Sequence, residues 1–429
     1  MARSSNVLTG IKDAFNSFDN VDVFYSNLKC DENKLLEFIS IFSNIEDTRM
    51  DNKCTYSTMT IVGIVFFGLL FNMDTWIEIE AFAREKKNFI GKFVDLSNGV
   101  PSHDTLERVF SLINSTTLED ALVDFIRKSI EATARILEVT DNGTDLLAID
   151  GKELNGTGRK YGSDEKTKNV QIMHFYYVST GVCIRSQLIE EKTNEIPTAQ
   201  KVLTALNIKD LIITSDAMNC QKETVAVISD GKAHYVLGLK GNHGDFHNEI
   251  VDKFASTNKY NKGCYYKMET EKNHNQVEIR EYYMISAKKF VFSEGWKNIK
   301  NVVMYKKTTT NNITGEEKIE RRYYITDLKD LELIALSARR HWAVENELHW
   351  HMDASLNEDA NKTVNRNAIN NLSIMKKNIL TILKLLQPLF GNRSIKLVRK
   401  LFTINYELNI MKLFTLLDEE SIKELIKAK

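Results

Sequence analysis

Cysteine is scarce in this 429-residue sequence, and the five cysteines are widely scattered. No Cys-X-X-Cys spacing occurs, which argues against both a disulfide framework and a cysteine-ligated zinc site. The start of the sequence lacks the apolar core of a signal peptide. The most apolar run, residues 59–71, is shorter than the about 20 residues that cross a bilayer, so it predicts a buried helix. Together these absences predict a cytoplasmic protein with no membrane partner.

Net charge is also small, at −1, so the overall balance gives no sign of a nucleic-acid partner. The charge is unevenly distributed, however. Residues 259–324 carry a net charge of +6 and residues 362–429 carry +8, which leaves −15 for the rest of the chain. This asymmetry predicts two basic regions on an acidic body. A solvated lysine-rich surface would explain the same counts without any partner.

The apolar patterning divides the chain into five consecutive segments. Residues 1–140 predict a helical N-terminal region. Residues 145–244 predict strand, hairpin, helix, strand, helix and strand, which is the order of a ribonuclease H-like α/β core. Residues 245–328 predict a β-rich insertion, after which residues 329–390 return to helix and complete the core. Residues 391–429 predict an amphipathic helical tail.

Two aspartates each close an apolar strand of this predicted core. Asp150 ends the run 145–150, and Asp216 follows the run 211–215. Continuous apolar runs are typical of parallel strands buried on both faces, so the two carboxylates are expected to be close together. Like charges so placed repel unless a cation bridges them, and Mg²⁺ or Mn²⁺ prefers such oxygen ligands. The alternative is that each aspartate only closes a turn or caps a helix.

A third acid, Glu345, lies on a predicted continuous helix over residues 331–351. Helical spacing places it on one stripe with His341 and His349. Three carboxylates from two strands and a helix can hold two metal ions, which activate a water or 3′-hydroxyl and stabilise the leaving oxygen at phosphorus. Two alternatives remain: an ion pair of Glu345 with either histidine, and a zinc site on the same stripe. The His-Glu-X-X-His arrangement of metalloproteases is absent.

Seven segments carry a resemblance to a known family. They are FSNIEDTR (42–49), NGVPSHDTLERVFS (98–111), AIDGKELNGT (148–157), EEKTNEIPTAQKVLTAL (190–206), IITSDAMNCQKETV (212–225), YVLGLKGNHG (235–244) and RHWAVENELHWHMDASLNEDANK (340–362). In order and spacing they resemble bacterial insertion-sequence transposases of the ISAs type, also called H-repeat-associated proteins. These belong to the DDE transposase superfamily, and the resemblance extends over nearly the whole chain.

The resemblance implies that Asp150, Asp216 and Glu345 are the DDE triad, the same three acids that the patterning indicates. It implies cleavage at transposon ends, followed by joining of the freed 3′-hydroxyl to target DNA, with two Mg²⁺ or Mn²⁺ ions. The implied partners are double-stranded DNA, as terminal inverted repeats and target, and a second copy of the chain, because two ends must be held together. By analogy, residues 1–140 bind the DNA ends or mediate dimerisation.

The sequence departs from the family pattern at several positions. A tyrosine, an arginine and a lysine often surround the catalytic glutamate, and here Ala338, His341 and Met352 replace them. This puts a hairpin-forming pathway in doubt, but not the metal chemistry. Asp-Thr-Arg at residues 47–49 replaces Asp-Pro-Arg, and residues 151–156 and 274–278 each lack an arginine of the pattern.

Further residues are candidates for DNA contacts through phosphate or through a stacked base. The candidates are Lys152, Lys240, Asn242, His341, Trp342, Arg393, Lys396, Arg399 and Lys400. Plain structural roles compete with each: a simple turn for the loop that holds Lys240 and Asn242, core packing for Trp342 and Trp350, and a solvated helix face for the basic group that begins at Arg393.

Two other functions stay open on the sequence alone. A metal-dependent DNA nuclease that cuts without strand transfer would share the triad. A non-catalytic DNA-binding descendant of a transposase would keep the fold, with no function for the acids.

Overall fold

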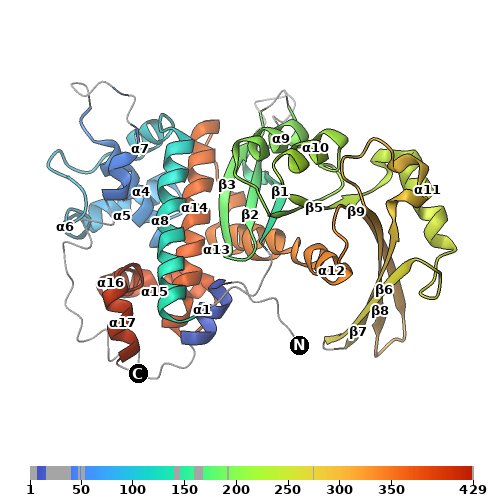
Figure 1. Cartoon of the computed structure of the whole chain (residues 1–429). Helices are drawn as coiled ribbons and strands as arrows, with labels where there is room; N and C mark the ends of the chain where they lie inside the picture. Colours follow the sequence, from blue (N-terminus) through green and yellow to red (C-terminus); the bar gives the residue numbers. More distant parts are fainter. Residues whose placement is uncertain are drawn as a thin grey trace. The chain divides into compact units, whose positions relative to one another are not determined.

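The computed structural model describes residues 7–15, 40–46, 49, 54–139, 145–158, 168–190, 193–273 and 275–427. The chain forms two compact units (Figure 1). We call them the sheet unit, which contains residues 144–151 and 189–344, and the helical unit, which contains residues 1–143, 152–188 and 345–429.

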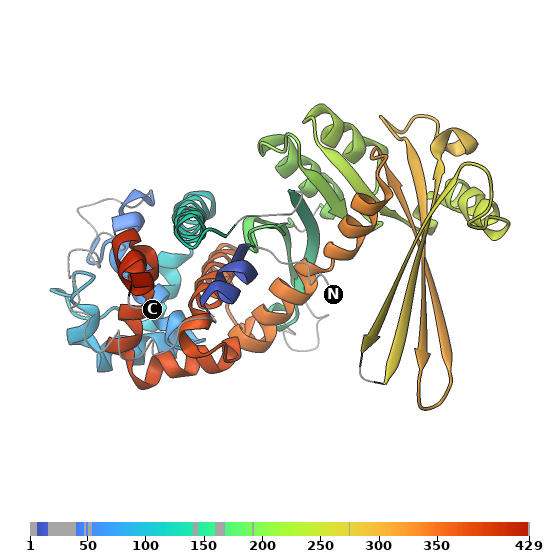
Figure 2. The ribbon, with the colours of Figure 1, turned by 60° about the horizontal axis from the view of Figure 1, so that its bottom comes forward.

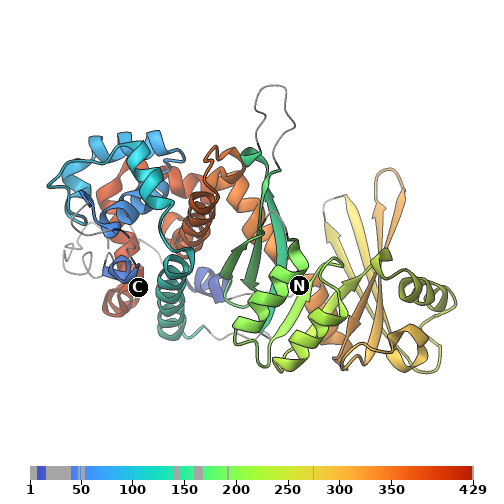
Figure 3. The ribbon, with the colours of Figure 1, turned by 90° about the horizontal axis from the view of Figure 1, so that it is seen from above.

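The sheet unit is built on three parallel strands, β4 (Ile212–Ser215), β5 (His234–Leu239) and β1 (Leu146–Leu154), of which residues 152–154 belong to the helical unit. Two crossover helices, α9 (Glu195–Ala205) and α10 (Lys222–Asp230), pack against one another beside these strands (Figure 3). The apolar strand residues are almost fully buried, as expected of parallel strands covered on both faces. The predicted alternation of strand and helix is thus confirmed here.

The predicted β-rich insertion contributes four long antiparallel strands, β6 (Cys264–Asn273), β7 (Gln276–Ser286), β8 (Asn301–Asn311) and β9 (Glu317–Thr326). β9 pairs with β5, so these strands extend the parallel sheet of the unit instead of forming a separate sheet. Figure 2 shows the far ends of the two hairpins extending away from the helix α11 (Gly244–Ala255).

Helix α11 precedes these strands and was not among the elements predicted within the β-rich insertion. Its buried side chains Phe246, Ile250 and Phe254 recur every four residues, which is a helical period. The aromatic and β-branched residues that follow favour strands, and their composition concealed the short helical stripe before them.

The helical unit is organised around α14 (Arg366–Leu386), a helix buried on almost every side. α8 (Ser115–Ile136) runs along it, as Figures 1 and 3 show. β2 (Val170–Tyr177) and β3 (Val182–Leu188) form an antiparallel hairpin, and β3 packs against both α8 and α14. The apolar run 59–71 forms α4 (Thr58–Leu70), whose residues are nearly all buried. The prediction of a buried helix there is confirmed, and no described helix is long and apolar enough to cross a membrane.

The remaining helices of this unit are short. They are α1 (Val7–Phe15), α5 (Trp76–Glu85), α6 (Lys87–Ile90), α7 (His103–Phe110), α13 (Trp350–Leu356), α15 (Ile395–Ile404), α16 (Tyr406–Leu417) and α17 (Glu419–Lys427). The last three confirm the predicted helical tail. Residue 274, part of the altered family pattern at 274–278, and residues 47–48 lie outside the described part of the chain.

Candidate active site

Asp150 and Asp216 occupy neighbouring positions at one edge of the parallel strands. The last paired residues of β1 and β4 are Ile149 and Ser215, so Asp150 and Asp216 follow in the same register. Adjacent strands lie about 4.8 Å apart, which brings the two backbones as close as a sheet allows. One part of the prediction was wrong: β1 does not end at Asp150 but continues to Leu154.

A turn closes directly after β4. The Asp216 Oδ1 accepts a hydrogen bond from the Met218 backbone N–H at 3.1 Å, which fixes the chain as it leaves the strand. The turn-closing role that competed with metal binding is therefore present. The two roles are compatible, because one carboxylate has two oxygens and about four acceptor sites.

Glu195 is a further acid at this edge, and the sequence analysis did not single it out. It lies in the first turn of α9. A Cβ built on Gly151 would be 2.3 Å from the Glu195 Oε1, so glycine is needed there for the carboxylate to fit. Burial and the charge of Asp216 raise the pKa of Glu195, with a smaller opposing effect from Asn219. A glycine inside a strand often marks a place where another group approaches the backbone closely. Gly151 was therefore the one feature of the sequence that could have indicated an approaching side chain such as Glu195.

The donor chemistry of this edge fits a hard divalent cation. Carboxylate and amide oxygens are the ligands that Mg²⁺ and Mn²⁺ prefer, and Asp150, Asp216 and Glu195 supply carboxylates at this end of the strands, with the Glu195 carboxylate beside Gly151. Asn219 is 1% exposed, and neither of its amide atoms has a hydrogen-bond partner of ordinary geometry among the described residues. Within the same residues, no three His, Cys, Asp or Glu side chains form a group that could hold a metal ion.

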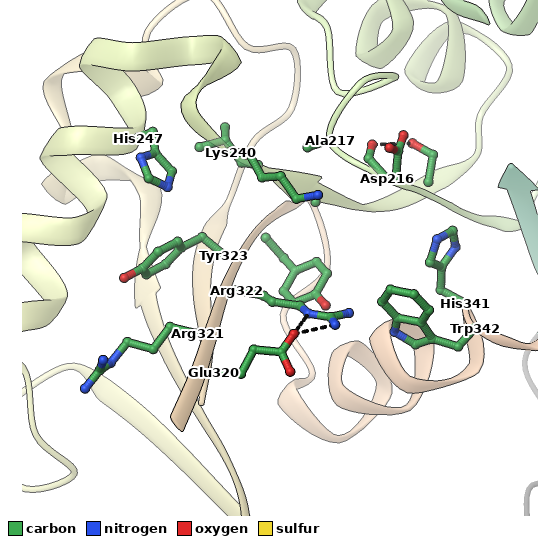
Figure 4. A pocket seen from close by; sticks show the side chains of 14 residues that line it. Asp216, Ala217, Lys240, His247, Glu320, Arg321, Arg322, Tyr323, His341 and Trp342 are labelled. Atoms are coloured by element: carbon green, nitrogen blue, oxygen red, sulfur yellow. Dashed lines mark hydrogen bonds and ion pairs between the residues drawn. The ribbon is translucent and has the colours of Figure 1, made fainter. Parts of the chain in front are cut away.

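A cavity of about 280 Å³ lies beside Asp216 in the sheet unit. Figure 4 shows Lys240, Arg322 and Trp342 around it, with the Lys240 ammonium directed toward its centre. The Arg322 guanidinium lies 4.2 Å from the centre of the Trp342 ring and donates to Glu320 at 2.7 Å. The cavity therefore combines positive charge with an aromatic face, next to a carboxylate.

His341 lines the same cavity but does not bring positive charge to it. Its Nδ1 lies 3.1 Å from the Thr214 hydroxyl. Burial lowers the pKa of His341 to about 4, although the charge of Asp216 opposes the shift, so the ring is neutral near pH 7. Its predicted contact with DNA could then be a hydrogen bond but not an ion pair.

Glu345 lies in the helical unit, on a π-helical turn over Val344–His349. The predicted continuous helix 331–351 is therefore wrong: α12 (Leu331–Arg340) is followed by a turn and then by the π-helical turn. A π-helical turn closes i→i+5 hydrogen bonds, so α-helical spacing does not hold across it. His341, Glu345 and His349 therefore do not share one α-helical stripe, and the zinc alternative loses its basis.

Polar contacts from two other elements hold this turn. The His349 Nε2 lies 3.0 Å from the Nδ1 of His174 on β2, which is fully buried. The Tyr176 hydroxyl, also on β2, donates to the Glu347 carboxylate at 2.8 Å. From α14, the Lys384 ammonium donates to the Glu347 backbone carbonyl at 2.7 Å.

Lys384 provides a direct test of whether this turn positions Glu345. Burial lowers the pKa of Lys384 to about 8, with Glu347 opposing the shift. On the prediction that Glu345 belongs to a DNA-cleaving triad, we expect Lys384→Met to slow DNA cleavage about 100-fold, because a displacement near 1 Å at a catalytic group has that effect. DNA affinity, measured by gel shift, should change less than about threefold.

Lys412→Met is the matched control for this substitution. Lys412 is also buried in the helical unit and donates to a backbone carbonyl, that of Leu389, at 3.4 Å. It should cost similar stability while leaving the cleavage rate intact. Equal loss of cleavage in both variants would show that Lys384 contributes only to folding.

Two predicted DNA contacts are corrected by burial. Lys152 is 7% exposed and forms ion pairs with Asp353 at 2.6 Å and with Glu358 and Asp359 at 3.4 Å. Arg399 is fully buried and donates to the Leu69 carbonyl and to Asp74. Both cations neutralise internal acids or carbonyls, since a buried charge requires a partner. Neither is available to phosphate in this structure.

The other candidates keep accessible positions. Lys240, Arg393, Lys396 and Lys400 are exposed. The Asn242 side chain donates to the Ala217 carbonyl at 2.8 Å and so connects its loop to the chain after β4. Asn242 therefore has the structural role that competed with a DNA contact. Trp350 is 60% exposed, which excludes the core packing that competed with base stacking at that position.

Comparison with known proteins decides the family. A family model described as "Transposase DDE domain" matches residues 141–382, more than half of the chain, and one described as "DDE_Tnp_1-associated" matches residues 39–126. The chain belongs to the DDE transposase family. The first match contains all three acids of the predicted triad.

Individual relatives agree with this assignment. The chain is 29% identical to "Putative transposase YncI" of Escherichia coli O157:H7, over 86% of this chain and 92% of the relative. It is also 29% identical to "H repeat-associated putative transposase YhhI" of Escherichia coli strain K12, over 82% and 90%. The resemblance to H-repeat-associated transposases is thereby confirmed.

A solved structure is similar at a greater distance. A piggyBac transposase synaptic complex with hairpin DNA matches 98% of this chain and 82% of its own, at 11% identity and a TM-score of 0.38. That similarity is too low to support details of this fold.

Proposed function

We propose that this DDE transposase cleaves DNA at the ends of an insertion sequence and joins the freed 3′-hydroxyl to target DNA. Asp150, Asp216 and Glu345 are the proposed catalytic and metal-binding triad. The observation that carries the proposal is the register of β1 and β4, which places Asp150 beside Asp216 in a chain of this family. The parallel strands with α9 and α10 support a ribonuclease H-like core around them.

The proposed cofactor is a pair of Mg²⁺ or Mn²⁺ ions. When bound, such ions activate the attacking hydroxyl and neutralise charge on the leaving oxygen at phosphorus. The carboxylates of Asp150 and Asp216 supply hard oxygen ligands and fix where the reacting phosphate lies. Lys240 and Arg322 place positive charge at the neighbouring cavity, and the Trp342 ring offers a face on which a base can stack.

The proposed partners are the terminal inverted repeats, a target duplex and a second copy of the chain. Exposed Arg393, Lys396 and Lys400, in and just before α15, are proposed phosphate contacts. Residues 1–140 are proposed to bind the DNA ends or to mediate dimerisation, in keeping with the separate family model that matches residues 39–126.

A strand-transfer assay tests the proposal. A labelled duplex that carries the inverted repeat flanking the gene is incubated with the protein, a supercoiled plasmid and Mg²⁺. We expect label in the plasmid, and we expect EDTA to abolish it. Cleaved end DNA with no joined product would overturn transposition in favour of the nuclease alternative.

A further inference from the structure

The position of Glu195 is unusual for an acid that only begins a helix. Its carboxylate lies over Gly151, the residue after Asp150, with Oε1 2.3 Å and Oε2 3.2 Å from the point that a Cβ would occupy. The charge of Asp216 also acts on it. Glu195 thus lies beside the chain directly after Asp150 and within electrostatic reach of Asp216, although it is not a member of the proposed triad.

Asn219 is an independent sign that this edge binds a ligand. The side chain is 1% exposed, and its Oδ1 and Nδ2 have no hydrogen-bond partner of ordinary geometry within the described residues. Its effect on Glu195 shows that the amide faces that carboxylate. The amide N–H can donate to the Glu195 carboxylate, but the buried Asn219 Oδ1 has no donor among the described residues. An unsatisfied buried acceptor is costly, and a ligand bound at this position would satisfy it.

We propose that Glu195 is a further metal-binding carboxylate of this transposase, which supplies an oxygen ligand to the divalent cation held by Asp150 and Asp216. The inference rests on the proposed function, since it needs that cation. Three carboxylates at one edge repel each other without a counter-charge, and a divalent cation removes the repulsion. Gly151 leaves the space for the Glu195 carboxylate, and Asn219 orients it.

The competing explanation is that Glu195 only stabilises the N-terminus of α9, where an acid interacts favourably with the helix dipole. A metal-binding measurement without DNA separates the two. Mn²⁺ is titrated into the full chain, and the free ion is followed by electron paramagnetic resonance. We expect Glu195→Gln to weaken Mn²⁺ binding about 10- to 100-fold.

Two further variants complete the comparison. Glu223→Gln removes an exposed acid from the first turn of α10, the neighbouring helix, and should leave Mn²⁺ affinity unchanged. Glu195→Asp keeps the charge at the helix terminus but shortens the side chain, so it should preserve the unfolding temperature and still weaken Mn²⁺ binding. If Glu195→Gln or Glu195→Asp binds Mn²⁺ like the unmodified chain, the inference is overturned.

Gly151→Ala tests the same geometry from the other strand. The added methyl group would occupy the position of the Glu195 carboxylate and displace it, so Mn²⁺ affinity should fall as in Glu195→Gln. The double variant Gly151→Ala with Glu195→Gln should then show little additional loss. Full additivity of the two losses would contradict a shared mechanism.

Asp216→Asn distinguishes this inference from the proposed function. If Asp216→Asn weakens Mn²⁺ binding and Glu195→Gln does not, only the role of Glu195 is refuted. If neither substitution changes Mn²⁺ binding, the metal site of the proposed function is refuted, and the inference with it.

Discussion

Asp216→Asn is expected to slow cleavage of end DNA by about 10³-fold or more, equivalent to about 4 kcal/mol of activation free energy. The substitution removes one negative charge from the proposed metal site and changes almost nothing else. Asparagine is isosteric, and its Oδ1 can still accept the hydrogen bond that Asp216 accepts from the Met218 N–H. The loss should therefore appear in the cleavage rate, measured with labelled duplex and Mg²⁺, while DNA affinity by gel shift stays within about threefold.

Asp210→Asn provides the control at the opposite end of β4. Asp210 is exposed and has a φ of 63°, a backbone conformation that asparagine tolerates well. Its cleavage rate should equal that of the unmodified chain. Glu345→Gln should behave like Asp216→Asn. If both triad variants keep full activity and Mg²⁺ dependence, the acids have no catalytic function, and the non-catalytic DNA-binding descendant becomes the better account.

Lys377→Met is expected to lower the free energy of unfolding by about 3 kcal/mol or more, because it leaves the buried Glu119 carboxylate with Arg185, at 3.1 Å, as its remaining counter-charge. Lys377 and Glu119 are each 1% exposed and form an ion pair that joins α14 to α8. Lys377 also donates to the Cys183 carbonyl at 3.0 Å, and Glu119 accepts from the Ser186 N–H at 2.7 Å. The pair thereby fastens both helices to β3, and urea unfolding followed by circular dichroism would report its loss.

A double-mutant cycle isolates the pair from ordinary packing. Lys377→Met combined with Glu119→Gln removes both charges and should recover at least about 1 kcal/mol relative to Lys377→Met alone. Lys396→Met, on the exposed face of α15, should change stability by less than about 0.5 kcal/mol. Additive effects of the two buried substitutions would mean that the ion pair itself contributes little.

The parallel strands and their aspartates could be predicted because local patterns specify them. Continuous apolar runs indicate buried strands, and an acid that interrupts such a run requires a counter-charge or a turn. The predicted strand ended too early, at Asp150, because the charged residues Lys152 and Glu153 interrupt the apolar run although the strand continues to Leu154. Helix α11 was missed because three buried residues in twelve give a weak helical signal beside strongly β-forming neighbours.

The basic candidates show the limit of arguments from residue type. Lys152, Arg399 and Lys400 look alike in a sequence, since each lies near polar or charged neighbours. Lys152 and Arg399 are buried and bind acids or carbonyls from distant parts of the chain, whereas Lys400 is exposed. A buried cation is recognised only through its partner, and for Lys152 that partner is about two hundred residues away.

The sequence by itself determined the family, the three candidate acids and the order of strands and helices, because each of these depends on local pattern and residue identity. Only the tertiary structure decided which further groups meet the strand-end aspartates. It placed Glu195 over Gly151, kept His341 neutral by burial, and held the turn of Glu345 with contacts from β2 and α14. These outcomes depend on distances between segments far apart in the chain, which the packing of the folded protein sets and local propensity does not.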